Sequence, residues 1–135
     1  MANYVCSVRS NYVRVKDEQA FKDFIEDFDC ELIRDTDGRV GFVCGPWDGG
    51  GPHSYSEEYG EYVQLVDCEE EIGRHLCEGE VLVIEEVGSE KMRYLVGISY
   101  AYNHKGECLF VSMASALREK VAAEWGAHNV SAAAY

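Results

Sequence analysis

Alternating apolar and polar residues predict β-strands in several stretches of the chain. The longest stretch, residues 91–102, has an apolar side chain at every second position: Met92, Tyr94, Val96, Ile98, Tyr100 and Tyr102. Because successive side chains of a strand point to opposite faces, these residues belong on one side of a sheet. Shorter runs rich in β-branched and aromatic residues predict further strands at 11–16, 80–87 and 107–113.

Two β-rich runs flank the dipeptide Asp37-Gly38, and together they predict a hairpin with strands of about 30–35 and 39–44. Both residues of the dipeptide tolerate a positive φ, which tight hairpin turns require. The following segment, residues 45–56, contains three consecutive glycines and both prolines of the chain, so it predicts a loop.

Residues 18–28 predict an amphipathic helix. Its apolar face consists of Ala20, Phe21, Phe24, Ile25 and Phe28. Charged side chains occupy the opposite face. Asp17 precedes the helix at the position where an N-cap carboxylate is favoured, and Glu18 follows in the first turn.

Two further helices are predicted in the second half of the chain. Residues 56–77 give a helix that is broken near Cys68 and ended by Gly79. Residues 115–126 give a helix with one apolar face: Leu117, Val121, Ala122 and Trp125.

The predicted order of elements is β-α-β-β-α-β-β-β-α. Strands joined by short hairpins favour an antiparallel sheet, and helices between the groups of strands favour a covering layer. We therefore expect a two-layer α+β fold, with five to six strands and about three helices packed on them. We expect one such domain over residues 1–126 and a loose tail over 127–135.

Composition and charge narrow the classes of function. The N-terminus lacks the apolar segment of a secretory signal, and no apolar run approaches the roughly 20 residues of a membrane span. These features predict a cytoplasmic protein whose six cysteines are free thiols, with Cys30, Cys44 and Cys108 packed in strands. The formal net charge of −13 disfavours direct binding to nucleic acid or to an anionic membrane.

Most of the negative charge lies in one segment. Residues 57–90 contain twelve acidic residues and one basic residue, Arg74, whereas the rest of the chain has a net charge of only −2. Clustered carboxylates could compete with phosphates for lysine and arginine side chains. We predict a partner-binding surface that includes two tyrosines, since tyrosine is enriched at interfaces. Its residues are Glu57, Glu58, Glu61, Asp67, Glu69, Glu70, Glu71, Glu78, Tyr55 and Tyr59. The alternative is an acidic solvated face with no partner.

No motif of enzyme chemistry is present. The glycine-rich segment 45–53 lacks the Lys and Ser/Thr of a phosphate-binding loop, and no nucleophile motif occurs. The spacing of Cys68, His75 and Cys77 matches no usual zinc site. We therefore predict no catalytic residue, no metal and no cofactor.

Two segments resemble known proteins. The sequences SNYVRVKDEQAF (10–21) and EVGSEKMRYLVG (86–97), about a fifth of the chain, are similar to segments of small acidic proteins encoded on phages, prophages and integrative elements of bacteria. That group is largely of unassigned function, and the resemblance implies no catalytic residue. Small acidic proteins of mobile elements include inhibitors of restriction and of CRISPR effectors, some of them DNA mimics.

The resulting hypothesis is a non-enzymatic acidic inhibitor, of the anti-restriction or anti-CRISPR kind, that binds a basic, nucleic-acid-binding host defence protein. One alternative is a sponge for a nucleotide signal, with a site at residues 45–53 and Trp47. Another is a plain structural or oligomerisation domain, and a homodimer is compatible with the sequence.

Overall fold

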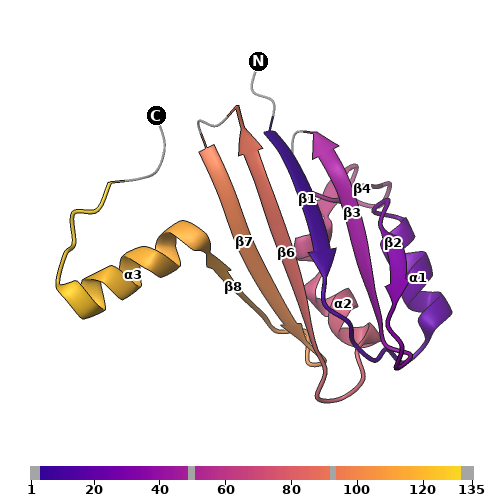
Figure 1. Ribbon diagram of the computed structural model, residues 1–135. Helices are drawn as coiled ribbons and strands as arrows, with labels where there is room; N and C mark the ends of the chain where they lie inside the picture. Colours follow the sequence, from indigo (N-terminus) through magenta and orange to yellow (C-terminus); the bar gives the residue numbers. More distant parts are fainter. Residues whose placement is uncertain (1–3, 49–50, 92–93, 132–135) are drawn as a thin grey trace.

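Six antiparallel strands form one sheet, and two helices cover one of its faces (Figure 1). The structure is a computed structural model that describes residues 4–48, 51–91 and 94–131. The strands of the sheet are β1 (Tyr4–Ser10), β2 (Glu31–Arg34), β3 (Val40–Asp48), β6 (Val81–Glu90), β7 (Tyr94–Asn103) and β8 (Cys108–Ser112). Their spatial order is β2-β3-β1-β6-β7-β8.

The remaining elements are a separate hairpin and four helical segments. They are β4 (His53–Ser56), β5 (Glu61–Gln64), α1 (Glu18–Glu26), the 3-10 turn η1 (Leu65–Asp67), α2 (Glu69–His75) and α3 (Met113–Trp125). The α+β class with an antiparallel sheet is confirmed.

The main core lies between the sheet and the two covering helices. Phe21 and Ile25 of α1 and Ile72 of α2 belong to one buried cluster with Phe42 of β3 and Leu82 of β6, and each is at most 1% exposed. Burying a side chain of this size stabilises the fold by about 1.5–3 kcal/mol. The helical spacing of the apolar residues therefore placed α1 correctly on the sheet.

The N-terminus of α1 is also confirmed. The Oδ1 atom of Asp17 accepts a hydrogen bond from the amide of Ala20 at 3.1 Å. This bond satisfies one of the backbone donors that a helix start leaves without an intrahelical partner.

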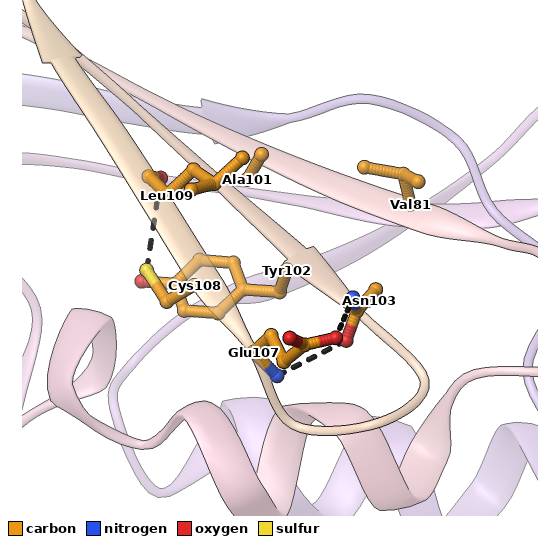
Figure 2. Close-up of a pocket in the computed structure, with 7 residues that line it drawn as sticks. All are labelled: Val81, Ala101, Tyr102, Asn103, Glu107, Cys108 and Leu109. Carbon is orange, nitrogen blue, oxygen red and sulfur yellow. Dashed lines mark hydrogen bonds between the residues drawn. The ribbon is translucent and has the colours of Figure 1, made fainter.

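The second face of the sheet carries exposed apolar side chains, and we call it the open face. The apolar residues of β6, β7 and β8 that point to it are Val81, Val83, Val87, Leu95, Ala101, Leu109 and Val111, and Glu85 and Ser99 point to it as well. Figure 2 shows three of them, one from each strand, lining a hollow of about 270 Å³: Val81, Ala101 and Leu109. Leu109 is 76% exposed, so this face is open to solvent in the single chain.

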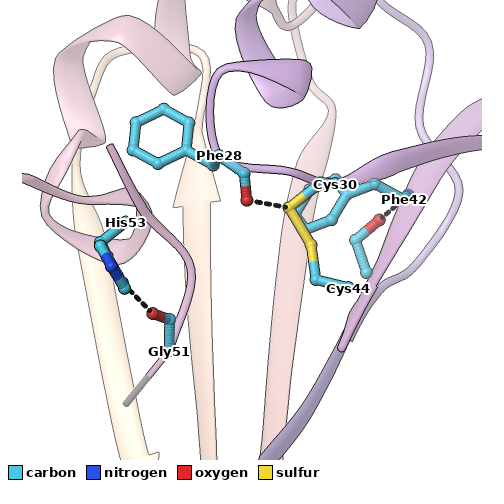
Figure 3. The surroundings of a disulfide bond; sticks show 7 residues. Phe28, Cys30, Phe42, Cys44, Gly51 and His53 are labelled. Carbon is cyan, nitrogen blue, oxygen red and sulfur yellow. Dashed lines mark hydrogen bonds between the residues drawn. A yellow bond between two sulfur atoms is a disulfide. The ribbon is translucent and has the colours of Figure 1, made fainter. Parts of the chain in front are cut away.

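Cys30 and Cys44 form a disulfide (Figure 3), so the expectation of free thiols is wrong for this pair. In the β2–β3 pairing Glu31 stands opposite Val43, which brings the cysteines just beyond them face to face. Their Cα atoms are 4.7 Å apart, within the range that a disulfide spans. Cys108 does lie in a strand, but it is exposed rather than packed.

The strand predicted at 11–16 is wrong, because that segment makes only isolated bridges. The strand near the N-terminus is instead β1, which precedes residues 11–16 and lies between β3 and β6. Polar residues hid this strand in the sequence. One of them, Ser10, is 2% exposed. Its Oγ accepts a hydrogen bond from the amide of Phe42 at 2.9 Å, so this buried hydroxyl has a partner.

The first part of the helix predicted at 56–77 is instead the β4–β5 hairpin. Tyr55 and Tyr62 face each other across it with ring centroids 5.3 Å apart. Gly60 has a φ of 65° in the connecting turn, a conformation that glycine adopts without steric cost. The apparent helical spacing combined residues of a turn with residues of a strand, and only α2 forms an α-helix here.

Two other boundaries differ from the predictions. The loop expected at 45–56 is shorter, because β3 extends into it and β4 closes it. The strand expected at 80–87 is longer, because residues 88–90 also belong to β6 and pair with β1. Met92 and residues 49–50 lie outside the described residues.

The third helix forms as predicted but contributes no buried residue. It ends at Gly126, which has the left-handed conformation of a helix C-cap. Residues 127–131 form no helix or strand, and the rest of the predicted tail lies outside the described residues. None of the helices in the described part of the chain has the length and apolar character of a membrane span.

Candidate functional site

The structure divides the predicted acidic residues into three groups. The first group lies at the turn of the β4–β5 hairpin and contains Glu57, Glu58 and Glu61, all of them exposed. The turn is fixed locally, because the amide of Gly60 donates to the carbonyl of Ser56 at 2.8 Å. These three carboxylates are therefore presented on an ordered turn.

The second group lies at the start of α2. Asp67 ends η1, and Glu69, Glu70 and Glu71 form the first turn of α2. Carboxylates at this position interact favourably with the positive end of the helix dipole. This interaction explains locally how four acids are tolerated within five residues.

Glu78 lies apart from the second group. It follows the C-terminus of α2, and the amide of the next residue, Gly79, approaches Nδ1 of His104 at 3.4 Å in the β7–β8 turn. Glu78 and Glu69 are thus at opposite ends of α2. We define the acidic surface as the first two groups only.

The acidic surface is poorly neutralised. Of its members within the described residues, only Glu70 has an ion pair, with Arg74 at 3.6 Å, and both side chains are more than 70% exposed. Such exposed pairs contribute little free energy. The other ion pairs of the described residues lie on α1, on α3 and around the β2–β3 hairpin. The negative charge of this surface therefore faces solvent.

The electrostatic field of the acidic surface reaches the sheet. Burial, followed by the charges of Glu71, Asp67 and Glu69, raises the pKa of the Cys68 thiol to about 11. Burial is also the main cause of the raised pKa of Tyr100 on β7, followed by the charge of Glu86 and then that of Asp67. Carboxylates near α2 thus act on side chains of a neighbouring element.

A row of aromatic rings connects β3 to the β4–β5 hairpin. The centroid distances are 4.9 Å from Trp47 to His53, 5.2 Å from His53 to Tyr62 and 5.3 Å from Tyr62 to Tyr55. Tyr55, Tyr62 and Tyr59 are 55%, 66% and 70% exposed. The hairpin therefore presents three tyrosines beside its carboxylates.

Tyr62 was not among the predicted binding residues. It falls within the helix predicted at 56–77, whereas the hairpin places it opposite Tyr55 and in contact with His53. The serine-rich sequence before Glu57, together with Gly60, was the available signal for a hairpin.

The thiols and histidines show no arrangement typical of nucleophilic catalysis. Burial raises the pKa of the thiols of Cys6, Cys68 and Cys108, whereas a nucleophilic cysteine requires a lowered pKa. The His75 ring packs between Phe21 and Phe24, with centroids 5.7 and 5.0 Å away. Burial lowers the pKa of His75 and favours its neutral form.

The predicted ligand loop is largely committed to internal contacts. Trp47 packs on His53, whose Nδ1 lies 3.1 Å from the carbonyl of Gly51 (Figure 3), and Pro52 is buried. Residues 49–50, at the centre of this loop, lie outside the described residues.

Comparison of the chain with protein-family models, with curated proteins and with solved structures gives no match. These comparisons therefore assign no function to the chain.

Proposed function

We propose that the protein is a non-enzymatic acidic inhibitor that binds a basic, nucleic-acid-binding protein of a bacterial host. The observation that carries this proposal is the acidic surface, where seven carboxylates on consecutive elements have one exposed ion pair among the described residues. The carboxylates would pair with the lysines and arginines that otherwise hold phosphates.

The neighbouring tyrosines support a protein partner. Tyr55, Tyr59 and Tyr62 are large, more than half exposed and held by a hairpin. Such side chains supply contact area at low cost in conformational entropy. A surface that served only to keep the protein dissolved would not need them.

The setting of the proposal comes from the resemblance to small acidic proteins of phages and mobile elements. In that setting the partner is a restriction enzyme or a CRISPR effector, and the inhibitor acts in the host cytoplasm by occupying its DNA-binding groove. Binding should weaken steeply with added salt, because it depends on charge.

The test is competition with DNA. A panel of purified restriction enzymes and guide-loaded CRISPR effectors is bound to fluorescent duplex DNA, and anisotropy reports its displacement by the protein at low and high salt. We expect displacement of DNA from at least one panel member at low salt.

Charge reversal locates the interaction. The triple variant Glu58→Lys, Glu61→Lys and Glu71→Lys should lose displacement. A control with the same change of charge, Asp23→Lys, Asp27→Lys and Glu31→Lys, reverses exposed acids outside this surface and should retain it. Circular dichroism verifies the fold of both variants. Equal competition by the two triple variants, or no displacement from any panel member, would overturn the proposal.

A further inference from the structure

Helix α3 buries none of its residues fully within its own chain. None of its 13 residues is buried, and Leu117 and Trp125 are 63% and 78% exposed. Isolated helices shorter than about 12–15 residues are marginal in water, because most helical stability in proteins comes from packing of one face. This helix therefore needs a partner surface.

The apolar residues of α3 form one stripe. Met113, Leu117, Val121 and Trp125 recur every four residues, which places them along one side of a helix. The charged residues between them are two basic and two acidic: Arg118, Glu119, Lys120 and Glu124. The helix is thus amphipathic and electrically balanced.

The helix begins on the open face and then leaves its own sheet. A Cβ atom placed on Gly97 of β7 would lie only 3.3 Å from the Cβ atom of Met113, so the first turn sits directly on this face. Beyond that turn α3 extends past the edge of the sheet formed by β8 (Figure 1). Its apolar stripe therefore projects into the space beyond β8.

Strand β8 lacks the features that protect edge strands. Its residues Leu109, Phe110 and Val111 are 76%, 73% and 48% exposed, and residues 108–117 contain no charged side chain. Natural sheets usually protect an edge with lysine, proline or a bulge, because exposed backbone groups pair with other chains. This edge is open to pairing.

The open face beside β8 has hollows that can accept side chains. Val81, Ala101 and Leu109 line the hollow shown in Figure 2, and Val83 and Val111 contribute to another of about 250 Å³. Their linings are mainly apolar, although the first includes Asn103 and Glu107, and both lie close to the strand edge from which α3 departs.

We propose that this end of the molecule binds a second copy of the same chain. Strand β8 pairs with β8 of the other copy, and α3 of each copy lies across the open face of the other. One two-fold axis generates both contacts, since each copy supplies a helix and a face that receives one. Helix α3 extends beyond the β8 edge of its own sheet, which is the side on which the sheet of the second copy would lie.

Charge limits where a second copy can bind. Each chain carries a net charge of −13, so two copies repel each other wherever their acidic surfaces approach. The segment 108–117 contains no charged residue, so contact through it adds no like-charge pair of its own. A basic partner would gain nothing from this segment and would bind the acidic surface instead.

The proposed contact combines several surfaces. Specific interfaces bury about 1,200–2,000 Å² in total. Each α3 is about 20 Å long at 1.5 Å per residue. The dimer would join two such helices, the two faces beneath them and two paired strands, and these together must reach that size for the dimer to be stable.

The oligomeric state tests the proposal directly. Sedimentation velocity of the full chain from about 1 to 100 μM should show a species of twice 15.2 kDa at the upper end. The double variant Leu117→Lys and Trp125→Lys should raise the dissociation constant at least about 100-fold. The matched control, Tyr55→Lys and Tyr59→Lys, replaces exposed aromatic residues of the hairpin and should dimerise normally.

Hydrogen exchange identifies the contacts. In the dimer the amides of α3 and of the outer edge of β8 should exchange more slowly than at a concentration where the chain is monomeric. A wild-type chain that stays monomeric at 100 μM, a dimer insensitive to the α3 variant, or a dimer without added protection in α3 would overturn the proposal. Added salt should leave the dimer intact while it weakens binding to a basic partner, so the two proposals fail independently.

Discussion

Strands β3 and β8 have similar sequences but very different environments. Residues 41–44 read Gly-Phe-Val-Cys and residues 109–112 read Leu-Phe-Val-Ser, yet Phe42 is 1% exposed and Phe110 is 73% exposed. Phe42 points to the face that α1 covers, whereas no helix of the described chain covers Phe110 at the sheet edge. Apolar character selects the strand conformation, but the neighbouring layer decides burial.

The helices show the same contrast. Helix α1 buries Phe21 and Ile25 against the sheet, whereas α3 of the same chain buries nothing. The covered half of the molecule should therefore carry most of the free energy of unfolding. The part formed by β8 and α3 should depend on association for its order, whereas β7 is held to the core by Tyr102, which is fully buried.

The largest expected difference between the two halves comes from a pair of matched truncations. Phe42→Ala should lower the free energy of unfolding by about 3–5 kcal/mol, because it leaves a cavity in the core. Phe110→Ala, measured where the chain is monomeric, should change it by less than about 0.5 kcal/mol. Urea denaturation followed by circular dichroism measures both values, and equal losses would contradict the division into two halves.

The next effect concerns the disulfide at the covered end. Replacing Cys30 and Cys44 by alanine should cost about 3 kcal/mol, the value for cross-linking a loop of this length. The matched control replaces Cys77 and Cys108, which are free thiols, and should cost much less. Denaturation with and without reductant measures the same quantity: reductant should lower the stability of the wild type and leave the Cys30/Cys44 variant unchanged.

The sequence predicted those elements whose local signals agreed with their tertiary environment. The capped helix α1, the hairpin at Asp37-Gly38 and the strands β6, β7 and β8 are present. The strand β1 was missed because it alternates polar and apolar residues weakly, and its position between β3 and β6 is a long-range property. The β4–β5 hairpin was missed because a turn joined to a strand imitated helical spacing.

For the candidate surface, the identity of the charged residues was readable from the sequence, but their grouping in space was not. Residues that are close in the chain, such as Glu71 and Glu78, end at opposite ends of α2. The exposure of Tyr62 depends on a cross-strand contact with Tyr55 that no local pattern encodes. The exposure of α3 could not be predicted from the sequence either. Its apolar stripe predicts that one face is buried, but it does not indicate whether the covering surface belongs to the same chain or to another.

The smallest effect, and the most direct comparison of the two halves, comes from the caps of the two helices. Asp17 caps α1 by accepting the amide of Ala20, and Ser112 caps α3 by accepting the amide of Ser115 at 3.2 Å. Removing a cap costs about 1 kcal/mol of helix stability wherever it lies.

The readout of that cost should differ between the helices. Helix α1 is part of the cooperative core, so Asp17→Ala should lower the free energy of global unfolding by about 1 kcal/mol. Helix α3 contributes no buried residue, so Ser112→Ala in the monomer should reduce helical circular dichroism without shifting the urea midpoint. At dimer concentrations the same variant should also weaken association, because a less populated helix binds its partner surface less tightly. A shifted midpoint for monomeric Ser112→Ala would mean that α3 already belongs to the core of its own chain.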